Sequence, residues 1–380
     1  MRRALGEPRR DWQARVESQG LVYHTPLGVP YWDESAHYVF KRGEIDVLEA
    51  ATAELQRICL DAAQHVIDHD RFAEFGVPPN VVAAIKQSWD AEPPSIYGRF
   101  DLAYDGSGPP KLLEYNADTP TSLLEAAVVQ WYWLQDVSPN DDQWNSIHER
   151  LVEKWRELKE YLWAPVYFAH VDAREHEDLM TVTYLRDTAS EAGLGTLGIA
   201  MSEIGADDGR GEFVDLAGSR IASIFKLYPW EWMVHEAFGQ RMLESLERQQ
   251  IQVIEPIWKM LWSNKALLAV LWELFPHHPN LLEAHLNDRG SLRSFAKKPL
   301  MSREGANVTL VRDGSVVATM DGDYGDEGYV FQELAVAQID GKYPVIGAWV
   351  VDGVPAGMGI RESDTPITGN LARFVPHRLI

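Results

Sequence analysis

The sequence has 380 residues, of which 57 are acidic and 35 basic, and its formal net charge is −22. This charge argues against binding to nucleic acids, whose phosphates attract lysine- and arginine-rich surfaces, and it is compatible with a cationic substrate. The length exceeds the size at which a single hydrophobic core keeps growing, so two or three domains or subdomains are expected.

The composition and the N-terminus predict a cytoplasmic protein. No apolar run reaches the length of a membrane span, and the first residues, MRRALGEPRRDW, lack the apolar core of a signal peptide. The single cysteine, Cys59, cannot form an intramolecular disulfide. It lies in a helical pattern, where a buried small side chain is expected.

Apolar spacing predicts a helical N-terminal part. A helix over residues 43–70 is expected after an irregular start over 1–40. A second helix, over 122–136, is expected to begin with an S-x-x-E capping box of Ser122 and Glu125. Further expected elements are helices over 145–163, 232–250 and 259–276, a short strand over 182–185, and a helix that begins at 188–192 with Thr188 and Glu191 as a second capping box.

After Pro256 the pattern changes to β-rich runs. Two of them, NVTLVRDGSVVATM (307–320) and KYPVIGAWVVDGVPAGMGI (342–360), contain Asp-Gly between apolar stretches, a strong signal for a β-hairpin. The C-terminal third is therefore expected to be mostly antiparallel sheet, and the whole chain to be of the α+β class.

The stretch YGRFDLAYDGSGPPKLLEYNADTPTSLLE (97–125) concentrates polar groups around one turn. If YGRFDLAY is a strand, alternation puts Arg99 and Asp101 on one face. If KLLEYNA is the next strand, Glu114 and Asn116 likewise share a face. DGSGPP is typical turn sequence, so pairing of the two strands in a suitable register would bring all four side chains together.

Two carboxylates and an amide oxygen are hard ligands that suit Mg²⁺, and an adjacent arginine suits a carboxylate or a phosphate. From the spacing alone, a solvated hairpin face with one surface ion pair is an equally good interpretation, because charged strand faces are common in antiparallel sheets.

This stretch resembles the signature of the synthetase domain of bifunctional glutathionylspermidine synthases and their stand-alone homologues. Further resembling segments follow in the same order and cover nearly the whole chain: PYWDESAHYVF (30–40), EPIWKMLWSNKALLAVLWELFPHHPNLL (255–282), AKKPLMSREGANV (296–308), VFQEL (330–334) and DGKYPVIGAWVVDGVPAGMGIRE (340–362). The resemblance implies an ATP-grasp fold and the ligation of a carboxylate to an amine through an acyl phosphate.

Residue by residue, the resemblance implies three Mg²⁺ ligands, which are Asp101, Glu114 and Asn116. It places Arg99 against the reacting carboxylate or the transferred phosphate. Thr119 and Thr121 fall where the family has small hydroxyl residues near the acid substrate, with threonine here in place of serine.

Taken alone, Lys265 and Lys298 are expected at the surface, as most lysines are. The resemblance reverses this expectation, because both positions match ATP-binding lysines of the family. Lys298 also precedes a flexible, glycine-bearing loop, PLMSREGAN (299–307), in which an ammonium group and backbone N–H groups could hold phosphate.

Arg361 lies in GMGIRESDTPITG, which is expected to be a loop with a charged tip or, by the resemblance, a mobile lid that carries an arginine to the phosphate. The segment VFQEL is expected to read the adenine edge, with Gln332 and Leu334 as the candidate residues.

Two weaker patterns lie between these regions. REHED (174–178) lacks the ligands that zinc would need, so a solvated turn is expected, yet it lies where the family keeps acids that hold a cationic amine. Glu175 and Glu177 are therefore candidates for the amine site. GLGTLG (193–198) matches a dinucleotide pattern, but a helix is expected before it and a strand after it, the reverse of a Rossmann unit.

The resemblance divides one synthetase unit into a helical part (1–90), an acid-substrate and Mg²⁺-binding α/β part (91–255), and an ATP-binding part (256–380) with a phosphate loop and a lid. The sequence shows no counterpart of the cysteine amidase domain of the bifunctional relatives, so amidase activity is not expected.

The predicted function is that of a carbon–nitrogen ligase that uses ATP and Mg²⁺ and acts on a small-molecule or short-peptide acid and an amine, without nucleic-acid or membrane partners. The identity of the substrates and the oligomeric state stay open, with a homodimer as one alternative. Two other functions are kept: a non-catalytic ATP-binding or sensing module, which would not need Arg99, and a Mg²⁺-dependent phosphohydrolase, for which the sequence shows no activated nucleophile.

Overall fold

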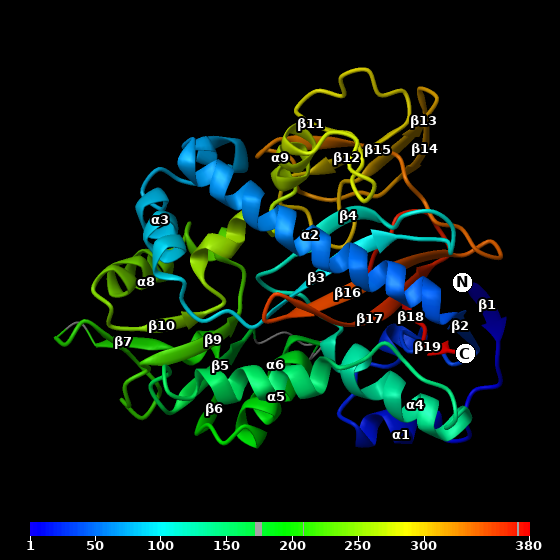
Figure 1. Cartoon of the computed structure of the whole chain (residues 1–380). Helices are drawn as coiled ribbons and strands as arrows, with labels where there is room; N and C mark the ends of the chain where they lie inside the picture. Colours follow the sequence, from blue (N-terminus) through cyan, green and yellow to red (C-terminus); the bar gives the residue numbers. More distant parts are fainter. Residues whose placement is uncertain (172–176, 208, 371) are drawn as a thin grey trace.

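The computed structural model describes residues 1–171, 177–207, 209–370 and 372–380. It is a mixed α/β structure with several sheets and helices packed against them (Figure 1). The helices are α1 (Trp12–Ser18), α2 (Arg42–Asp68), α3 (Val82–Ala91), α4 (Gln130–Val137), α5 (Ile147–Leu158), α6 (Glu177–Glu191), α7 (Trp230–Met233), α8 (Ala237–Glu247) and α9 (Ala266–Leu274).

An antiparallel sheet with the order β18-β17-β16-β3-β4 lies at the centre of the molecule. Its strands are β3 (Tyr97–Ala103), β4 (Lys111–Asn116), β16 (Tyr343–Val351), β17 (Val354–Ser363) and β18 (Arg373–Phe374). The long helix α2 crosses one face, and α5 lies toward the other (Figure 1). The sheet thus joins a hairpin from residues 97–116 to one from residues 343–363, with β3 paired to β16.

A parallel sheet with the order β10-β9-β5-β6 lies beside it. Its strands are β5 (Val166–His170), β6 (Thr196–Ala200), β9 (Ser223–Leu227) and β10 (Gln252–Ile254). From β5 the chain adds β6 on one side, and it then adds β9 on the other side of β5. This reversal between β5 and β9 is a topological switch point, and such points leave a crevice outside the carboxyl ends of the strands.

The third large sheet has the order β11-β15-β12-β13-β14 and is antiparallel, as predicted for the C-terminal third. Its strands are β11 (Ala284–Leu286), β12 (Phe295–Pro299), β13 (Thr309–Arg312), β14 (Ser315–Thr319) and β15 (Tyr329–Glu333). Both predicted Asp-Gly hairpins form, because Asp313 and Asp352 take the positive φ that such turns require.

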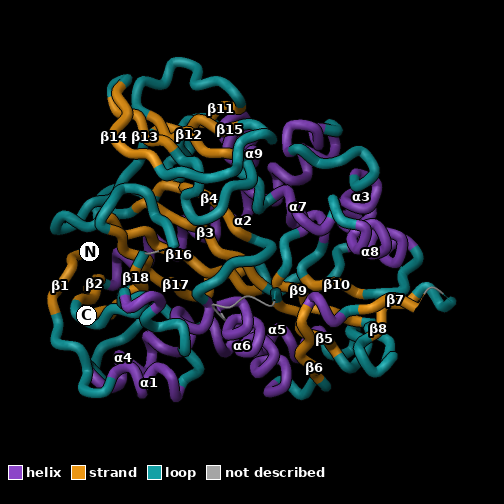
Figure 2. Tube along the Cα trace, turned by 180° about the vertical axis from the view of Figure 1, so that it is seen from behind, coloured by secondary structure: helices purple, strands orange, loops and turns teal. Residues whose placement is uncertain are grey.

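The prediction of an irregular start is wrong. Residues 1–40 contain β1 (Arg2–Leu5), α1 and β2 (Ala36–Phe40), and β2 also pairs with β19 (His377–Leu379) near the C-terminus. The two chain ends consequently lie close together, as Figure 2 also shows. A strand that pairs with a partner more than 330 residues away leaves little local signal in the sequence.

The remaining short strands, β7 (Gly205–Asp207) and β8 (Glu212–Val214), form a separate hairpin.

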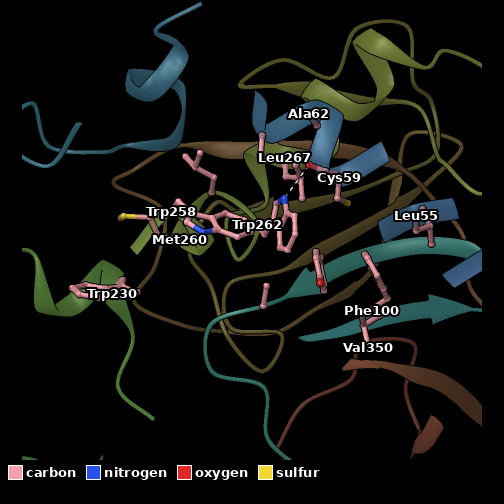
Figure 3. Close-up of a cluster of buried hydrophobic side chains, with 14 of the residues drawn as sticks. Leu55, Cys59, Ala62, Phe100, Trp230, Trp258, Met260, Trp262, Leu267 and Val350 are labelled. Atoms are coloured by element: carbon pink, nitrogen blue, oxygen red, sulfur yellow. Dashed lines mark hydrogen bonds between the residues drawn. The ribbon is translucent and has the colours of Figure 1, made fainter. Parts of the chain in front are cut away.

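The largest hydrophobic cluster joins α2, the segment 257–262 and the central sheet (Figure 3). The indole nitrogen of Trp262 donates to the carbonyl of Cys59 on α2 at 2.9 Å, and the ring of Trp258 stands edge-on to it. Cys59 is fully buried, which confirms its predicted structural role. Within the described ranges, no helix is both long enough and apolar enough to cross a bilayer.

Two predictions between residues 180 and 192 are wrong. The predicted strand 182–185 and the predicted helix start at 188–192 both lie inside α6. Val182 is β-branched and Tyr184 aromatic, which favours a strand locally, but both are buried in the same core cluster as α5, and this packing overrides the propensity. The hydroxyl of Thr188 donates to the carbonyl of Leu185 within the helix, so it does not cap a new one.

The predicted capping box at Ser122 is also absent. Ser122 has a φ of 65°, and its hydroxyl lies 2.9 Å from the hydroxyl of Tyr31. The same tyrosine donates to the carboxylate of Glu125 at 2.8 Å. The side chains of Ser122 and Glu125 therefore bind Tyr31 of the N-terminal segment, a tertiary contact that the sequence pattern could not indicate.

A buried ion pair fastens the parallel sheet to the loop after β4. The ammonium group of Lys226, at the end of β9, contacts Asp118 at 2.7 Å, and their side chains are 1% and 0% exposed. The backbone N–H of Trp230 donates to the second carboxylate oxygen of Asp118 at 2.8 Å. This pair fixes the loop that follows Asn116.

We expect Lys226→Met to lower the free energy of unfolding by about 3–5 kcal/mol, because it leaves a buried carboxylate without its cation. Urea denaturation at neutral pH measures the loss. The control is Arg42→Met, which breaks an exposed pair with Asp46 and should cost about 1 kcal/mol or less. Equal, small losses in both variants would contradict the assignment.

Candidate active site

The register of β3 and β4 brings the predicted polar group together. Arg99 lies opposite Asn116, and Asp101 lies opposite Glu114. An irregularity follows Asp101, and as a result Leu102 pairs with Leu112. Leu113, which strict alternation places on the face away from Glu114, instead lines the same cavity as Glu114.

One carboxylate holds two arginines from different strands. Asp101 accepts a hydrogen bond from Nε of Arg99 at 2.6 Å and another from Nη2 of Arg361 at 2.7 Å. Gly347 on β16 makes this possible, because a Cβ there would lie 2.8 Å from Cδ of Arg99. The guanidinium of Arg99 also lies over the ring of Trp349.

The prediction that Arg361 lies in a loop or lid is wrong. Arg361 is in β17, paired with Val345 of β16 and with Phe374 of β18. The glycine at position 359 is explained by close packing, because a Cβ there would lie 2.7 Å from the ring of Phe374. Arg361 is therefore held by the sheet.

Both candidate lysines are buried and converge on Glu114. Lys265 Nζ lies 3.0 Å from Oε2 of Glu114 and donates to the carbonyl of Ser302 at 2.6 Å. Lys298 donates to the carbonyl of Leu113 at 3.0 Å. Burial would raise the pKa of Glu114, but the two ammonium groups lower it to about 2. Burial lowers the pKa of Lys298 to about 8, against the attraction of Glu114.

A narrow cavity, here called the lysine slot, opens beside Lys298. Its walls are largely apolar and come from β4, the third sheet and the segment 366–368, with Leu113, Ala296, Val308, Leu310, Leu334 and Ile367 among them. Gln332 lines the slot, but both ends of its side chain bind protein: Oε1 accepts from Lys298 at 2.7 Å and Nε2 donates to the carbonyl of Leu112 at 2.9 Å. Gln332 thus positions Lys298, while Leu334 lies on the slot wall.

The loop between β12 and β13 forms part of the slot wall. Ser302, Glu304 and Gly305 line it. Gly305 has a φ of +72°, and a Cβ there would lie 2.7 Å from Ile367, so only glycine fits between the loop and the segment 366–368. A glycine that allows such close approach is typical of loops that enclose phosphate.

A second cavity, here called the switch-point cavity, lies outside the carboxyl ends of β5 and β9. Val171, Leu227 and Pro229 come from these ends, and Arg99, Thr119 and Thr121 come from the central sheet and the loop after it. The two cavities share lining residues at their junction, namely Glu114, Lys265, Ser302, Glu304 and Arg361. A molecule in one cavity can thus meet a molecule in the other beside these charges.

Both predicted threonines line the switch-point cavity. The hydroxyl of Thr119 accepts hydrogen bonds from both Nη atoms of Arg303 at 3.0 Å, and the carbonyl of Thr121 accepts one from Nη1 of Arg99 at 2.7 Å. The amide of Asn116 exchanges hydrogen bonds with the backbone of Thr119 at 3.2 and 3.3 Å. These contacts fix the loop 116–121 between two arginines.

Carboxylates occupy the opposite wall of this cavity. Glu177 begins α6, and burial together with the neighbouring charge of Glu125 raises its pKa to about 7. Burial also raises the pKa of Asp178 to about 6, although the charge of Arg303 opposes the shift. The other predicted amine-site residue, Glu175, lies outside the described residues. The carboxylates of this wall would attract an ammonium group when they are ionised.

Sequence reasoning missed three residues of this site: Asp178, Glu231 and Arg303. Arg303 donates to Glu231 at 2.7 Å and lies over the ring of Trp232. Arg303 was within the loop predicted to be flexible, and Asp178 follows Glu177 directly, so only the fold reveals that all three face one cavity.

The fold is of the ATP-grasp type. Over its whole length the chain is similar in fold to a glutathione synthetase-like effector from Globodera pallida, with a TM-score of 0.57 at 11% identity, covering 99% of this chain and 98% of that one. A family profile described as "Glutathionylspermidine synthase preATP-grasp" matches residues 3–380. The chain therefore belongs to the glutathionylspermidine synthase family, as the sequence resemblance predicted.

Curated relatives carry ligase and synthetase names. The chain is 40% identical to the Haemophilus influenzae protein named "Putative acid--amine ligase", and the match covers 100% of both chains. It is 30% identical to the trypanothione synthetase of Crithidia fasciculata and 25% identical to the bifunctional glutathionylspermidine synthetase/amidase of Escherichia coli. These two matches cover 83% and 93% of this chain but only 52% and 59% of the relatives.

The burial of Glu177 gives a prediction that needs no substrate. The native state binds the Glu177 proton more tightly than the unfolded chain, so this group lowers stability as pH rises from about 4.3, the unfolded value, to about 7. We expect Glu177→Gln to melt at a higher temperature than the native protein at pH 8, with the difference vanishing near pH 4. The control is Asp187→Asn on the exposed face of α6. A difference that is the same at both pH values would contradict the raised pKa.

Proposed function

We propose that this protein is an ATP-dependent ligase that joins a carboxylic acid to an amine through an acyl phosphate. The observation that carries the proposal is the charge at the junction of the two cavities. Arg99, Arg361, Lys265 and Lys298 surround Asp101 and Glu114 there, and the carboxylate of Glu304 also lines both cavities. The excess of buried cations suits a polyphosphate that reacts with a carboxylate.

The lysine slot is the proposed nucleotide site. Its apolar walls suit a flat base, and Lys298 and Lys265 lie further in, where phosphates would be bound. The strand end beyond Gln332, which includes Leu334, supplies backbone groups at the outer edge. The chain's similarity to named synthetases supports this assignment.

The donor chemistry at the junction fits Mg²⁺, which prefers oxygen ligands and takes part of its shell from phosphates and water. Asp101 and Glu114 are opposite one another across β3 and β4, and Asn116 lies in the same hairpin with its side-chain oxygen bound to the backbone N–H of Thr119 at 3.2 Å. Among the described residues, no three His, Cys, Asp or Glu side chains gather into a ready metal cluster, so substrate oxygens are needed to complete a shell. The bound ion would neutralise charge on the transferred phosphoryl group.

The switch-point cavity is the proposed site of the acid and the amine. Arg99 lines this cavity but not the lysine slot, which supports a role in holding the acid carboxylate. Arg361 lines both and can stabilise the negative charge that develops between them. The acid carboxylate takes the phosphoryl group, the amine then attacks the acyl carbon, and amide and phosphate are released.

The acid is proposed to be a small peptide or amino acid, and the amine a diamine, polyamine or amino acid, in a cytoplasmic setting. The names of the relatives support this range, and the carboxylate wall of Glu177 and Asp178 supports a cationic second substrate. A simple ATP sensor would not need Arg99 in a separate cavity, which favours the ligase over the sensing alternative.

We expect calorimetry to detect Mg²⁺-dependent ATP binding that the double variant Lys265→Ala/Lys298→Ala abolishes. Both ammonium groups would contact phosphate, and charge-assisted contacts of this kind contribute about 1.5–3 kcal/mol each. The matched control is Lys297→Ala, whose ammonium group lies over the ring of Tyr329. Equal ATP affinity of the native protein and the double variant would contradict the nucleotide site.

We also expect Arg99→Met to retain ATP binding and lose amide formation about 10²–10³-fold, the usual effect of removing one donor to a developing charge. Mass spectrometry of a matrix of acids and amines, incubated with ATP and Mg²⁺, detects the condensed product. If no pair yields an amide while ADP still forms at the same rate without amine, the protein is a phosphohydrolase and the ligase proposal is wrong.

A further inference from the structure

Glu177 lies close to the arginine that is proposed to bind the acid substrate. It lines the switch-point cavity, and its carboxylate contacts the side chain of Thr121. The carbonyl of the same threonine accepts the hydrogen bond from Nη1 of Arg99. One residue thus separates Glu177 from the guanidinium that is proposed to bind the reacting carboxylate, and this step rests on the proposed function.

Two other acids of the cavity have cationic partners, and Asp178 faces Arg303. Glu114 is paired with Lys265, and Glu231 with Arg303. Glu177 forms no ion pair with any residue that the structure describes, and its nearest charged neighbours are carboxylates. The titratable and charged groups around it are Glu125 and Tyr31 behind the cavity wall, Asp178 on its own helix, Glu304 on the loop after β12, Arg303 beside Asp178, and Arg99 behind Thr121.

Burial and these neighbouring carboxylates raise the pKa of Glu177, so that it can exchange a proton near neutral pH. Its pKa is about 7. A general base works best when its pKa is close to the working pH, because the group is then partly ionised and still binds a proton well. Asp178 is less suited because it faces the cation of Arg303, whereas Glu177 contacts Thr121 beside Arg99. Glu177 and Asp178 therefore have different roles: Asp178 attracts the ammonium group, and Glu177 accepts its proton.

The amine must lose a proton before it can react. An aliphatic amine has a pKa near that of lysine, about 10.4, and is an ammonium ion without a lone pair at neutral pH. We propose that Glu177 is the general base of the ligase, which removes this proton from the amine substrate beside the acyl carbon.

The ammonium group gives a proton to the carboxylate of Glu177, which becomes a neutral acid. The free amine attacks the acyl carbon; the C–N bond forms and the C–O bond to phosphate breaks. The departing phosphate takes the second proton of the nitrogen, and Glu177 later returns its proton to water.

Two nucleophiles of different basicity separate this role from binding and folding. With glutathione as the probe acid and with ATP and Mg²⁺, hydroxylamine traps an acyl phosphate as a hydroxamate and is itself uncharged at neutral pH, so it needs no base. Spermidine is the probe that needs one. We expect Glu177→Gln to form hydroxamate at the native rate and to lose about 10²–10⁴-fold in kcat with spermidine.

The pH profile gives the second signature. In the native protein the rate with spermidine should rise with pH through about 7, and in Glu177→Gln that step should be absent, with activity recovering only at high pH, where the amine loses its proton unaided. Asp187→Asn, at an exposed position of α6, is the matched control and should behave like the native protein. A loss confined to KM, or an equal loss with both nucleophiles, would overturn the assignment.

An infrared titration decides the point even if glutathione is not a substrate. The difference spectrum between native protein and Glu177→Gln should show a carboxyl group that titrates near pH 7. A midpoint near the ordinary value of about 4.3 would overturn the role of Glu177. If the native protein forms no hydroxamate from glutathione, the ligase proposal fails for this acid, and the titration alone judges Glu177.

Discussion

The site depends on one carboxylate that keeps two guanidinium groups close together. Arg99 on β3 and Arg361 on β17 come from strands on either side of β16, and Asp101 accepts a hydrogen bond from each. Without this shared anion the two cations would repel one another, and the nearby Lys265 and Lys298 would add to the repulsion. Glu114 pairs with Lys265 at 3.0 Å and attracts the charge of Lys298, so the protein maintains a dense positive charge that the nearby carboxylates only partly neutralise.

This arrangement is built by rigid elements. Arg361 lies within a paired strand, Gly347 leaves room for the Arg99 side chain, and the buried pair of Asp118 and Lys226 fixes the loop that carries the threonines. Such preorganisation lets charges meet a reacting group without a further cost of rearrangement. The parallel sheet contributes the crevice at its switch point, and the central sheet contributes the charges, so the two substrates of a ligase can meet at the boundary between sheets.

The sequence patterns predicted the elements that depend on residues close together in the chain. Alternation and turn residues were enough to predict β3, β4 and the Asp-Gly hairpins, and helical spacing was enough for α2. The register of β3 and β4 pairs Asp101 with Glu114 and so brings the polar side chains together as predicted, but the irregularity at Leu113 was not predictable from the pattern. The same patterns failed where distant packing decides, as in α6, whose β-branched and aromatic residues are buried against α5.

The candidate site was predictable to the extent that the family resemblance reached it. Composition alone favoured exposed lysines, and only the fold shows that Lys265 and Lys298 are buried against Glu114. Arg303 lies in a loop without a regular pattern, and its contact with Thr119 depends on the third sheet lying beside the central one. Glycines near Arg361 suggested mobility, yet they reflect close packing of β17 against its neighbours.

The most direct test of the central claim follows the oxygen atoms of the acid. An acid substrate labelled with ¹⁸O in its carboxylate is incubated with ATP, Mg²⁺ and the amine, and the released phosphate is analysed by mass spectrometry. Activation as an acyl phosphate predicts a labelled oxygen in the phosphate formed with each amide. Unlabelled phosphate would mean that water, and not the carboxylate, attacks ATP, and it would contradict the ligase mechanism.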